Sequence, residues 1–321
     1  MSDRHDPWPE GREPGRGGPT DGPPRSHGEA WRRPRRARRS PRHPEPPGRP
    51  FLDPAVVRTL ARRGAVLFAA QLVLIASLNV WQPNYSAFML ATEPDVVQEY
   101  VAIDHVSRNL LAAVMFHEDQ EFPDRLHAFD WDEYVARVEG HRAGEEDPSG
   151  STIHQQVAKN LFLWRNGSVL RKGLETVIAV QLAPLVEDVK VLEIYVNVAE
   201  FGPDIYGICA ASWYYYNRPP HDIEQRQAIE LAGLLPSPGH VSRVRGAPGR
   251  GIDRMVDGDP TSMYTIANAE RKLPRYFQVH GLDFVRALGV EGFAEPSPGA
   301  PHSCTTMPEE VADRIAREEG R

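Results

Sequence analysis

The clearest helical pattern in the chain begins at Thr152. Thr152 and Gln155 have the S/T-x-x-E/Q spacing of a capping box, in which two side chains bond the free amides at the start of a helix. Ile153, Val157 and Leu161 then recur at i, i+4 and i+8, which predicts one apolar stripe. Polar residues fall on another face. The sequence therefore predicts an amphipathic helix whose start can also offer dipole and free amides to an anion.

A second helical pattern follows the turn at 164–167. Its apolar positions at helical spacing are Leu170, Leu174, Val177, Ile178 and Leu182. Arg171, Lys172 and Glu175 lie one turn apart, so two cations and a carboxylate can converge on one face. Pro184 should kink or end this helix.

Residues 96–119 are predicted to form an earlier helix. Leu111, Val114 and Met115, at i, i+3 and i+4, form its apolar face, and Glu118 falls on the same face at i+7. Glu118 thus lies on an apolar stripe, where lost solvation makes a carboxylate a stronger base. The alternative is a structural glutamate paired at a helix end with Arg108 or Lys159.

The remaining patterns also favour helices. Helical spacing resumes over 186–201, and a further helix is predicted over 262–288. Residues 144–150 are predicted to form a flexible loop, and 295–321 a loosely ordered tail with one short helix. Periodicity alone therefore predicts a mostly α fold.

The longest uncharged apolar run, residues 64–81, is at the short end of what spans a bilayer. It is preceded by Arg58, Arg62 and Arg63 and closed by Trp81 and Tyr85. This arrangement is typical of a membrane helix with a cytoplasmic N-terminus. A cleaved signal peptide and a buried core helix are the alternatives, but the long extension before the run argues against a signal peptide. We predict a transmembrane helix over 64–82.

Charge divides the chain at this run. Residues 1–63 hold 15 Arg against 8 Asp and Glu, a net charge of +7, and the rest of the chain carries −14, giving −7 overall. Residues 1–60 are crowded with Pro, Gly and Arg, which predicts a disordered cytoplasmic tail. Because the basic end adjoins the apolar run, setting orientation is a simpler role for it than binding nucleic acid, and no nucleic-acid partner is predicted.

The two cysteines, Cys209 and Cys304, give neither a disulfide framework nor a metal-binding spacing. An extracytoplasmic domain could join them. Cys209, however, occupies the position of a small residue in a helix, so we predict an unpaired packing residue there and assign no role to Cys304.

Four polar segments carry the candidate chemistry. They read E-D-Q-E-F at 118–122, G-S-T-I-H-Q-Q-V-A-K-N at 150–160, R-K-G-L-E at 171–175 and Y-V-N-V-A-E-F-G at 195–202. Solvated, salt-bridged helix faces are the alternative, but they do not need paired Gln and Asn beside a cap. In this order, the segments resemble the glycosyltransferase module of peptidoglycan polymerases, most closely the monofunctional biosynthetic transglycosylases. The resemblance covers residues 110–238 and implies helices over 207–216 and 228–238.

The resemblance implies an all-α, lysozyme-like domain with two lobes over residues 95–250. The match fades beyond Arg250, and the sequence pattern predicts a C-terminal helical extension and tail over 251–321. The resemblance implies polymerisation of lipid II into β-1,4 glycan strands, with inversion and release of undecaprenyl pyrophosphate. Glu118 would be the general base. Glu175 would be the second catalytic carboxylate, supporting the pyrophosphate directly or through a divalent cation such as Mg²⁺ or Mn²⁺.

The resemblance also implies roles for the remaining polar residues. The predicted substrate-binding residues are Ser151, Thr152, Gln155, Gln156, Lys159, Asn160, Arg171 and Lys172. The predicted supporting residues are Asp119, Phe122, Asn197 and Glu200. The expected partners are lipid II, the growing lipid-linked glycan, the membrane and other cell-wall synthesis proteins. The expected location is the bacterial inner membrane, with a single pass and an extracytoplasmic catalytic domain.

The chain departs from the family pattern in three places. The segment after Phe122 is one residue longer and has Ala128 where the family has Gly, so His127 is left out of the catalytic set. Gly167 stands where relatives commonly have an Arg, for which Arg165 is a substitute, and Ala183 stands where they have Glu.

Two other functions compete with polymerisation. One is a lysozyme-like, glycan-cleaving enzyme, but cleavage of a neutral glycan needs no pyrophosphate site. The other is a catalytically degenerate protein that binds cell-wall precursors. Retention of both Glu118 and Glu175 favours activity.

Overall fold

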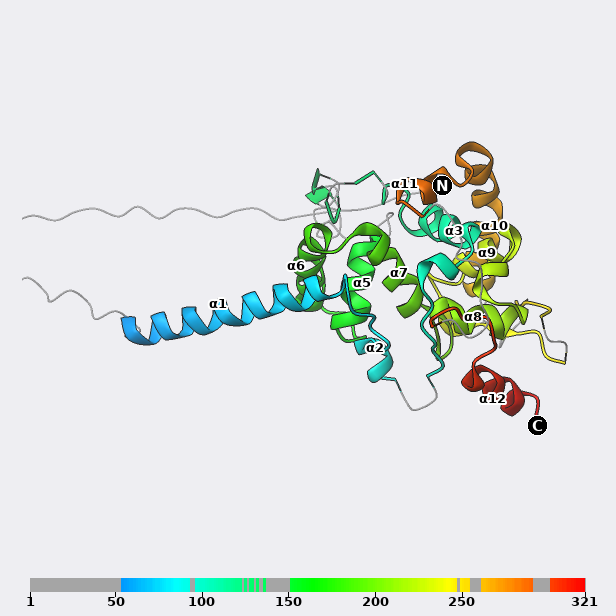
Figure 1. The fold of residues 1–321 in the computed structure, drawn as a ribbon, viewed down its shortest axis with the longest axis horizontal. Helices are drawn as coiled ribbons and strands as arrows, with labels where there is room; N and C mark the ends of the chain where they lie inside the picture. The colour runs from blue at the N-terminus through cyan, green and yellow to red at the C-terminus, as the bar shows by residue number, and fades with distance from the viewer. Residues whose placement is uncertain are drawn as a thin grey trace, which may run out of the picture. The chain divides into compact units, whose positions relative to one another are not determined.

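The described part of the chain is built mainly from helices (Figure 1). The computed structural model describes residues 53–320 except 93–95, 123, 126, 130, 133–134, 137–150, 247–248, 255–260 and 291–300. The α-helices are α1 (Pro54–Ser77), α2 (Ala87–Leu90), α3 (Arg108–Glu118), α5 (Ile153–Phe162), α6 (Val169–Leu185), α7 (Asp188–Val198), α8 (Gly207–Tyr216), α9 (Gln225–Ala232), α10 (Thr261–His280), α11 (Asp283–Ala287) and α12 (Glu309–Glu318). The predicted mostly helical fold class is confirmed.

Short strands and 3₁₀ turns complete the described elements. The strands pair antiparallel as β1 (Glu200–Gly202) with β2 (Ile205–Tyr206), and β3 (Ser242–Arg243) with β4 (Ile252–Asp253). The 3₁₀ turns are η1 (Ile103–His105), η2 (Pro220–Asp222) and η3 (Pro238–His240). The predicted disordered tail lies outside the described residues over 1–52, as does the predicted loop over 144–150.

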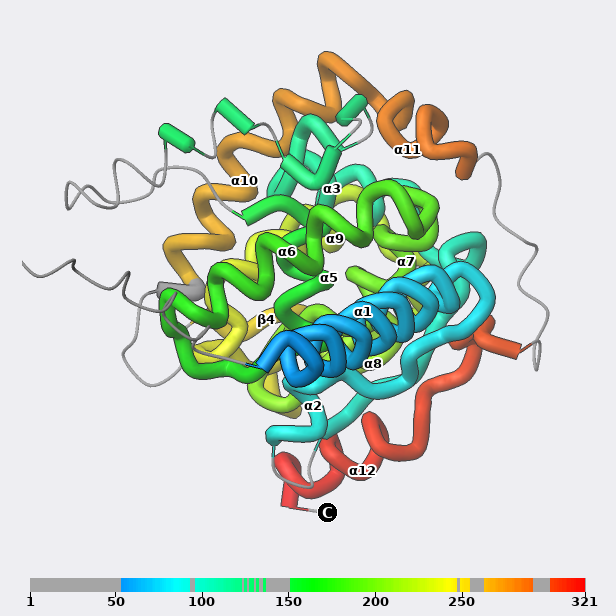
Figure 2. Tube along the Cα trace, turned by 90° about the vertical axis from the view of Figure 1, so that its left-hand side faces the viewer, coloured from blue at the N-terminus to red at the C-terminus, as the bar shows by residue number. Residues whose placement is uncertain are grey.

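Two groups of helices frame the candidate site. Helix α3 packs against α9, α10 and α11, while α5 packs against α6 and α7 (Figure 2). The side chains of Leu111, Val114 and Met115 on α3 are fully buried, as are Val157 on α5 and Leu192 on α7. Helices α3 and α5 therefore present their apolar stripes to the core, as their periodicity predicts.

Helix α5 starts where the capping box predicts. The Thr152 hydroxyl accepts a hydrogen bond from the Gln155 amide at 3.3 Å, and the Gln155 side chain accepts one from the Thr152 amide at 3.1 Å. Helix α6 ends at Leu185, one residue after Pro184, whose missing amide leaves the Val180 carbonyl without its helical partner. Both predictions are confirmed.

The predicted helix over 96–119 is wrong in its first half. Residues 96–107 run mostly in extended conformation, and α3 begins only at Arg108. The amide of Val97 bonds the Asp204 carbonyl, and the amide of Val101 bonds the Asn197 side chain. These partners are about a hundred residues away along the chain, so local periodicity cannot reveal them.

Three other helix predictions differ from the structure at their ends. Helix α7 stops at Val198 and the chain continues as β1, although the pattern ran to 201. Helix α9 ends at Ala232, before Pro236. The helix predicted over 262–288 is interrupted by a turn at Gly281, whose φ of +57° suits glycine.

Helix α1 is long and apolar enough to cross a membrane. It begins at Pro54, inside the segment predicted to be disordered, because Pro suits the first helical position and no helix breaker follows until Gly64. It ends at Ser77, and its outer side chains Val66 and Leu67 are 67% and 71% exposed. Ile75, near its C-terminal end, is buried against the domain.

Cys209 and Cys304 form a disulfide, so the prediction of an unpaired Cys209 is wrong. Their Cα atoms lie 5.9 Å apart although 95 positions separate them in sequence. The bond ties the C-terminal segment that carries α12 to α8. The Trp213 indole also donates to the Cys304 carbonyl at 3.2 Å, and the Tyr214 hydroxyl donates to Glu318 at 2.9 Å. The C-terminal segment predicted to be loosely ordered is therefore docked on the domain over residues 301–320.

Candidate active site

Glu118 is the last residue of α3, and its side chain is only 10% exposed. One carboxylate oxygen lies 2.7 Å from His117 Nδ1, and the other accepts a hydrogen bond from Gln156 Nε2 at 2.6 Å. Among the described ion pairs, none joins Glu118 to Lys159, one of the two partners of the structural alternative. The structure therefore places Glu118 as a shielded carboxylate held by two nitrogen groups.

Gln156 on α5 joins Glu118 to its surroundings. Its Nε2 also donates to the Ser151 carbonyl at 3.1 Å, and its Oε1 accepts from the Tyr195 hydroxyl at 3.2 Å. Burial raises the pKa of Tyr195, and the nearby Glu118 carboxylate raises it further, so this phenol stays protonated as a donor.

A second cluster gathers at the start of α6. Glu175, 1% exposed, accepts hydrogen bonds from Arg171 at 2.9 Å and from Lys172 at 2.6 Å. Lys172 Nζ also donates to the Ser151 hydroxyl at 2.9 Å. The two cations and the carboxylate therefore converge as the one-turn spacing predicts.

Ser151 connects the two clusters. Its carbonyl bonds Gln156, which bonds Glu118, and its hydroxyl bonds Lys172, which bonds Glu175. The two predicted catalytic carboxylates thus belong to one continuous hydrogen-bond network, although 57 positions separate them in sequence.

Lys159 lies on the adjacent turn of α5 and lines a cavity of about 180 Å³. The other polar residues of this lining include Gln156, Asn160, Tyr195 and Glu200. Burial lowers the pKa of Lys159, the nearby Arg171 and Lys172 cations add to the lowering, and the Glu175 carboxylate opposes it. Among the described residues, no carboxylate forms an ion pair with Lys159, which leaves its ammonium group for an anionic ligand.

Several predicted residues support the site from within the protein. Asp119 forms an ion pair with Arg125 and accepts from the Ile153 amide at 3.0 Å, which fixes the start of α5. Phe122 is fully buried against the His154 ring, with centroids 5.2 Å apart. Gln155 is 1% exposed and committed to the cap.

Two of the amides predicted to be free at the start of α5 are bonded within the protein. The Ile153 amide is bonded by Asp119 and the Gln155 amide by Thr152. The Thr152 hydroxyl itself donates to the Ala128 carbonyl at 2.8 Å. Thr152 and Gln155 therefore shape the site, whereas the side chains of Ser151, Gln156 and Lys159 face the network and the cavity.

Asn197 and Glu200 differ in their placement. Asn197 is fully buried and binds the backbone of Val101 through both ends of its amide, at 2.8 Å each. Glu200 lines the Lys159 cavity and pairs with Arg165 at 2.5 Å. Burial raises the pKa of Glu200, and the Arg165 cation opposes this.

Sequence reasoning missed three contributors to the site. Tyr195 heads the Y-x-N segment, so its motif could have identified it. Phe88 lies in the short helix α2, and its ring centroid is 6.0 Å from Lys159 Nζ. His117 adjoins Glu118 in sequence, but no spacing rule distinguishes it.

The residues at which the chain departs from the family pattern have no described contact with Glu118. His127 is exposed and lines a surface hollow with Phe129 and Trp131, and Ala183 lines an adjoining one. Gly167 has open space around the position of a Cβ. Arg165 reaches Glu200, and its guanidinium is 5.7 Å from the Phe88 ring centroid.

The side chains do not form a ready site for a divalent cation. Both oxygens of Glu175 are bonded by Arg171 and Lys172. Within the part of the chain that the structure describes, no three His, Cys, Asp or Glu side chains gather closely enough to hold a metal ion. We therefore assign no protein ligand to a metal and derive no step through one.

Comparison with known proteins shows the family of this chain. A family model described as transglycosylase matches residues 87–256. The biosynthetic peptidoglycan transglycosylase of Pasteurella multocida is 35% identical over 183 residues, which cover 54% of this chain and 73% of the relative. The protein of the same name from Agrobacterium fabrum is 38% identical over 209 residues, covering 62% and 90%. The one from Acinetobacter baumannii is 37% identical over 184 residues, covering 54% and 81%.

The matched residues contain the whole network from Glu118 to Glu175. The family model spans more than half of the chain, and the relatives are matched over most of their length. The resemblance inferred from the four polar segments is thereby confirmed, and the chain belongs to the transglycosylase family as a peptidoglycan glycosyltransferase.

Proposed function

We propose that this peptidoglycan transglycosylase joins lipid II to a lipid-linked glycan, with Glu118 as the base and the cluster at the start of α6 as the pyrophosphate site. The observation that carries the proposal is the continuous network from Glu118 through Gln156 and Ser151 to Lys172 and Glu175. It holds a proton acceptor and an anion-binding cluster in a fixed relation, as glycosyl transfer to a hydroxyl requires.

The reaction assigns one task to each cluster. The acceptor 4-hydroxyl oxygen attacks the donor anomeric carbon, its proton passes to Glu118, and a β-1,4 bond forms. The bond between that carbon and the pyrophosphate oxygen breaks with inversion, and undecaprenyl pyrophosphate carries away the electron pair. Gln156 orients the Glu118 carboxylate through its 2.6 Å hydrogen bond.

The negative charge that develops on the departing pyrophosphate must also be stabilised. Lys159, Arg171 and Lys172 supply positive charge near it, and such preorganised charge is usually a large contribution to catalysis. Glu175 acts through these cations, because its buried oxygens already bind Arg171 and Lys172. Its two oxygens orient the Arg171 and Lys172 side chains toward the pyrophosphate, so Glu175 is a positioning residue.

The site is expected to face the outer side of the cytoplasmic membrane. The apolar α1 supports a membrane anchor, and the arginines before it support a cytoplasmic N-terminus. The Cys209–Cys304 disulfide adds independent support, because disulfides persist in oxidising compartments outside the cytosol.

An apolar face on α6 supports a position at the bilayer surface. Val169, Leu170 and Val177 are 89%, 69% and 51% exposed. Gln181, on the same helix, hydrogen-bonds Gln71 of α1 at 2.9 Å, so this face adjoins the anchor. Lipid-linked substrates carry their polyprenyl tails in the membrane, and this arrangement brings the site to their head groups.

The reaction is tested by product analysis with detergent-purified full-length protein and labelled lipid II. The proposal predicts glycan strands that a muramidase digests, with one undecaprenyl pyrophosphate released per bond formed. Heat-denatured protein is the control. Binding of lipid II without polymer would indicate a precursor-binding protein, and shortening of preformed glycan would indicate a hydrolase; either result contradicts the proposal.

A further inference from the structure

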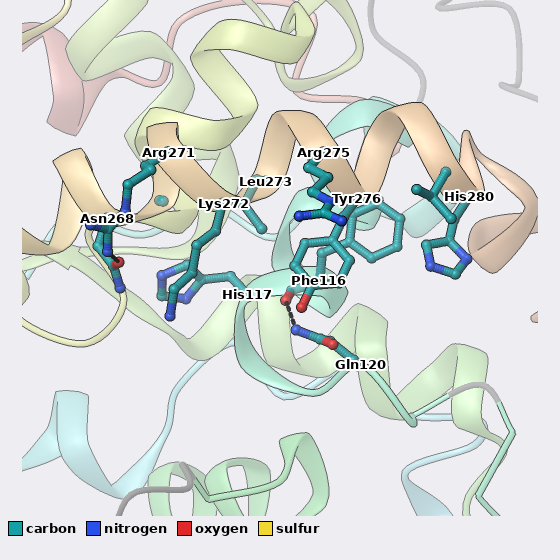
Figure 3. Close-up of a pocket in the computed structure, with 12 residues that line it drawn as sticks. Phe116, His117, Gln120, Asn268, Arg271, Lys272, Leu273, Arg275, Tyr276 and His280 are labelled. Atoms are coloured by element: carbon teal, nitrogen blue, oxygen red, sulfur yellow. Dashed lines mark hydrogen bonds between the residues drawn. The ribbon is translucent and has the colours of Figure 1, made fainter.

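His117 connects Glu118 to a second, larger cavity. Its Nδ1 lies 2.7 Å from a Glu118 oxygen, and its side chain is 13% exposed. The same ring lines a cavity of about 530 Å³ between α3 and α10 (Figure 3). The base is therefore separated from this cavity by one imidazole ring.

The cavity is lined by cations. Arg271, Lys272 and Arg275 line it from α10 together with His280, and none of the described lining residues is a carboxylate. Figure 3 shows these side chains along α10, on the side of that helix that faces His117. Glu118 is the one carboxylate within ion-pair distance of His117 among the described residues. An imidazole that carries a proton on Nδ1 can donate it in a hydrogen bond to the Glu118 carboxylate.

We infer that His117 is a positioning residue that orients the Glu118 carboxylate and makes its activity depend on the protonation of the imidazole. The inference rests on the proposed function of Glu118 as the base. Two donors, His117 and Gln156, each hold one oxygen of the carboxylate, so its plane is fixed while one lone pair on each oxygen stays open.

Protonation of the ring changes this arrangement. An imidazolium forms an ion pair with Glu118, which stabilises the ionised carboxylate and weakens it as a base. The rate should therefore fall, as pH decreases, when His117 gains its second proton. The exposed edge of the ring reaches solvent through the cavity, which provides the route for this proton.

Two substitutions separate orientation from titration. In His117→Asn, the side-chain amide can occupy the position of Nδ1 and donate to Glu118, but it cannot titrate. In His117→Ala, the donor is lost. His280→Asn is the matched control, because His280 lines the same cavity without a described contact to Glu118. Polymerisation of lipid II is measured as kcat and KM across pH, and thermal unfolding checks that each variant folds.

For His117→Ala we expect kcat to fall about ten- to a hundred-fold with KM unchanged, the effect of losing a hydrogen bond to a charged group. For His117→Asn we expect most of kcat to return and the acid limb of kcat/KM to move to lower pH. His280→Asn should leave that limb in place.

A merely structural role predicts a different result. The inference is overturned if His117→Asn lowers the rate equally at every pH, or if His117→Ala keeps the wild-type rate and acid limb. If the wild type is active, either result overturns the role of His117 but not the proposed function. A wild type that makes no polymer contradicts both.

Discussion

Lys159 has the most unusual environment among the cations of the site. It lies half-buried beside Phe88 and close to the cations of Arg171 and Lys172, and the Glu175 carboxylate that offsets these cations is already bonded by both. Such a lysine gains a counter-ion only when an anionic substrate arrives. Binding of pyrophosphate and retention of the Lys159 proton are therefore linked.

The linkage gives a pH prediction with a definite sign. Because the pKa of Lys159 is lowered, the free enzyme loses this charge at a lower pH than an ordinary lysine would. The alkaline limb of kcat/KM should therefore move to higher pH in Lys159→Arg, since arginine stays charged. We expect a loss of about ten-fold near neutral pH from the altered geometry. Identical alkaline limbs in variant and wild type would contradict this assignment.

Helix α5 carries Gln156 and Lys159, so its start determines where they lie. The Thr152 hydroxyl makes two hydrogen bonds there, one to the Gln155 amide and one to the Ala128 carbonyl. The cap therefore holds the helix and an otherwise distant segment together.

Thr152→Ala should lower the free energy of unfolding by about 1–2 kcal/mol through loss of the cap. It should also lower kcat, because α5 positions Gln156 beside Glu118. Thr152→Ser is the matched variant, since it keeps the hydroxyl. Urea unfolding of the two variants checks the prediction, and equal stability of Ala and Ser variants would refute it.

The elements that sequence could predict are those whose hydrogen bonds are local. The cap at Thr152 and the end of α6 after Pro184 depend on residues within one turn. Residues 96–107 depend on Asn197, Asp204 and Pro220, so their apolar spacing misled the helix prediction. Within the site, the order of the polar segments in the sequence was enough to predict Glu118 and the cluster at the start of α6. The role of Ser151 in joining them could be seen only in the structure.

At the scale of the whole molecule, the C-terminal segment is part of the folded domain. The disulfide joins Cys304 to α8, and Arg243 of β3 forms an ion pair with Glu319, which follows α12. The pairing was not predictable, because two cysteines 95 positions apart contain no information on the distance between them in space.

Replacing both Cys209 and Cys304 by alanine should lower the free energy of unfolding by about 2–4 kcal/mol, because the unfolded chain loses a long closed loop. Activity of the remaining folded protein should persist, since the bond lies outside the network around Glu118. Urea unfolding with and without reductant measures the effect. Wild type and double variant should become similar under reductant, and a difference that persists there would contradict this account of the bond.

The most direct test of the central claim is lipid II polymerisation by Glu118→Gln. Glutamine keeps the size of the side chain and its contact with Gln156 but cannot accept the proton. We predict a fall in polymer formation of about 10²–10⁴-fold, the usual contribution of a general base, with lipid II binding retained. Asp283→Asn, at an exposed ion pair, is the control and should match the wild type. Polymer formation by Glu118→Gln at the wild-type rate would contradict the assignment of Glu118 as the base.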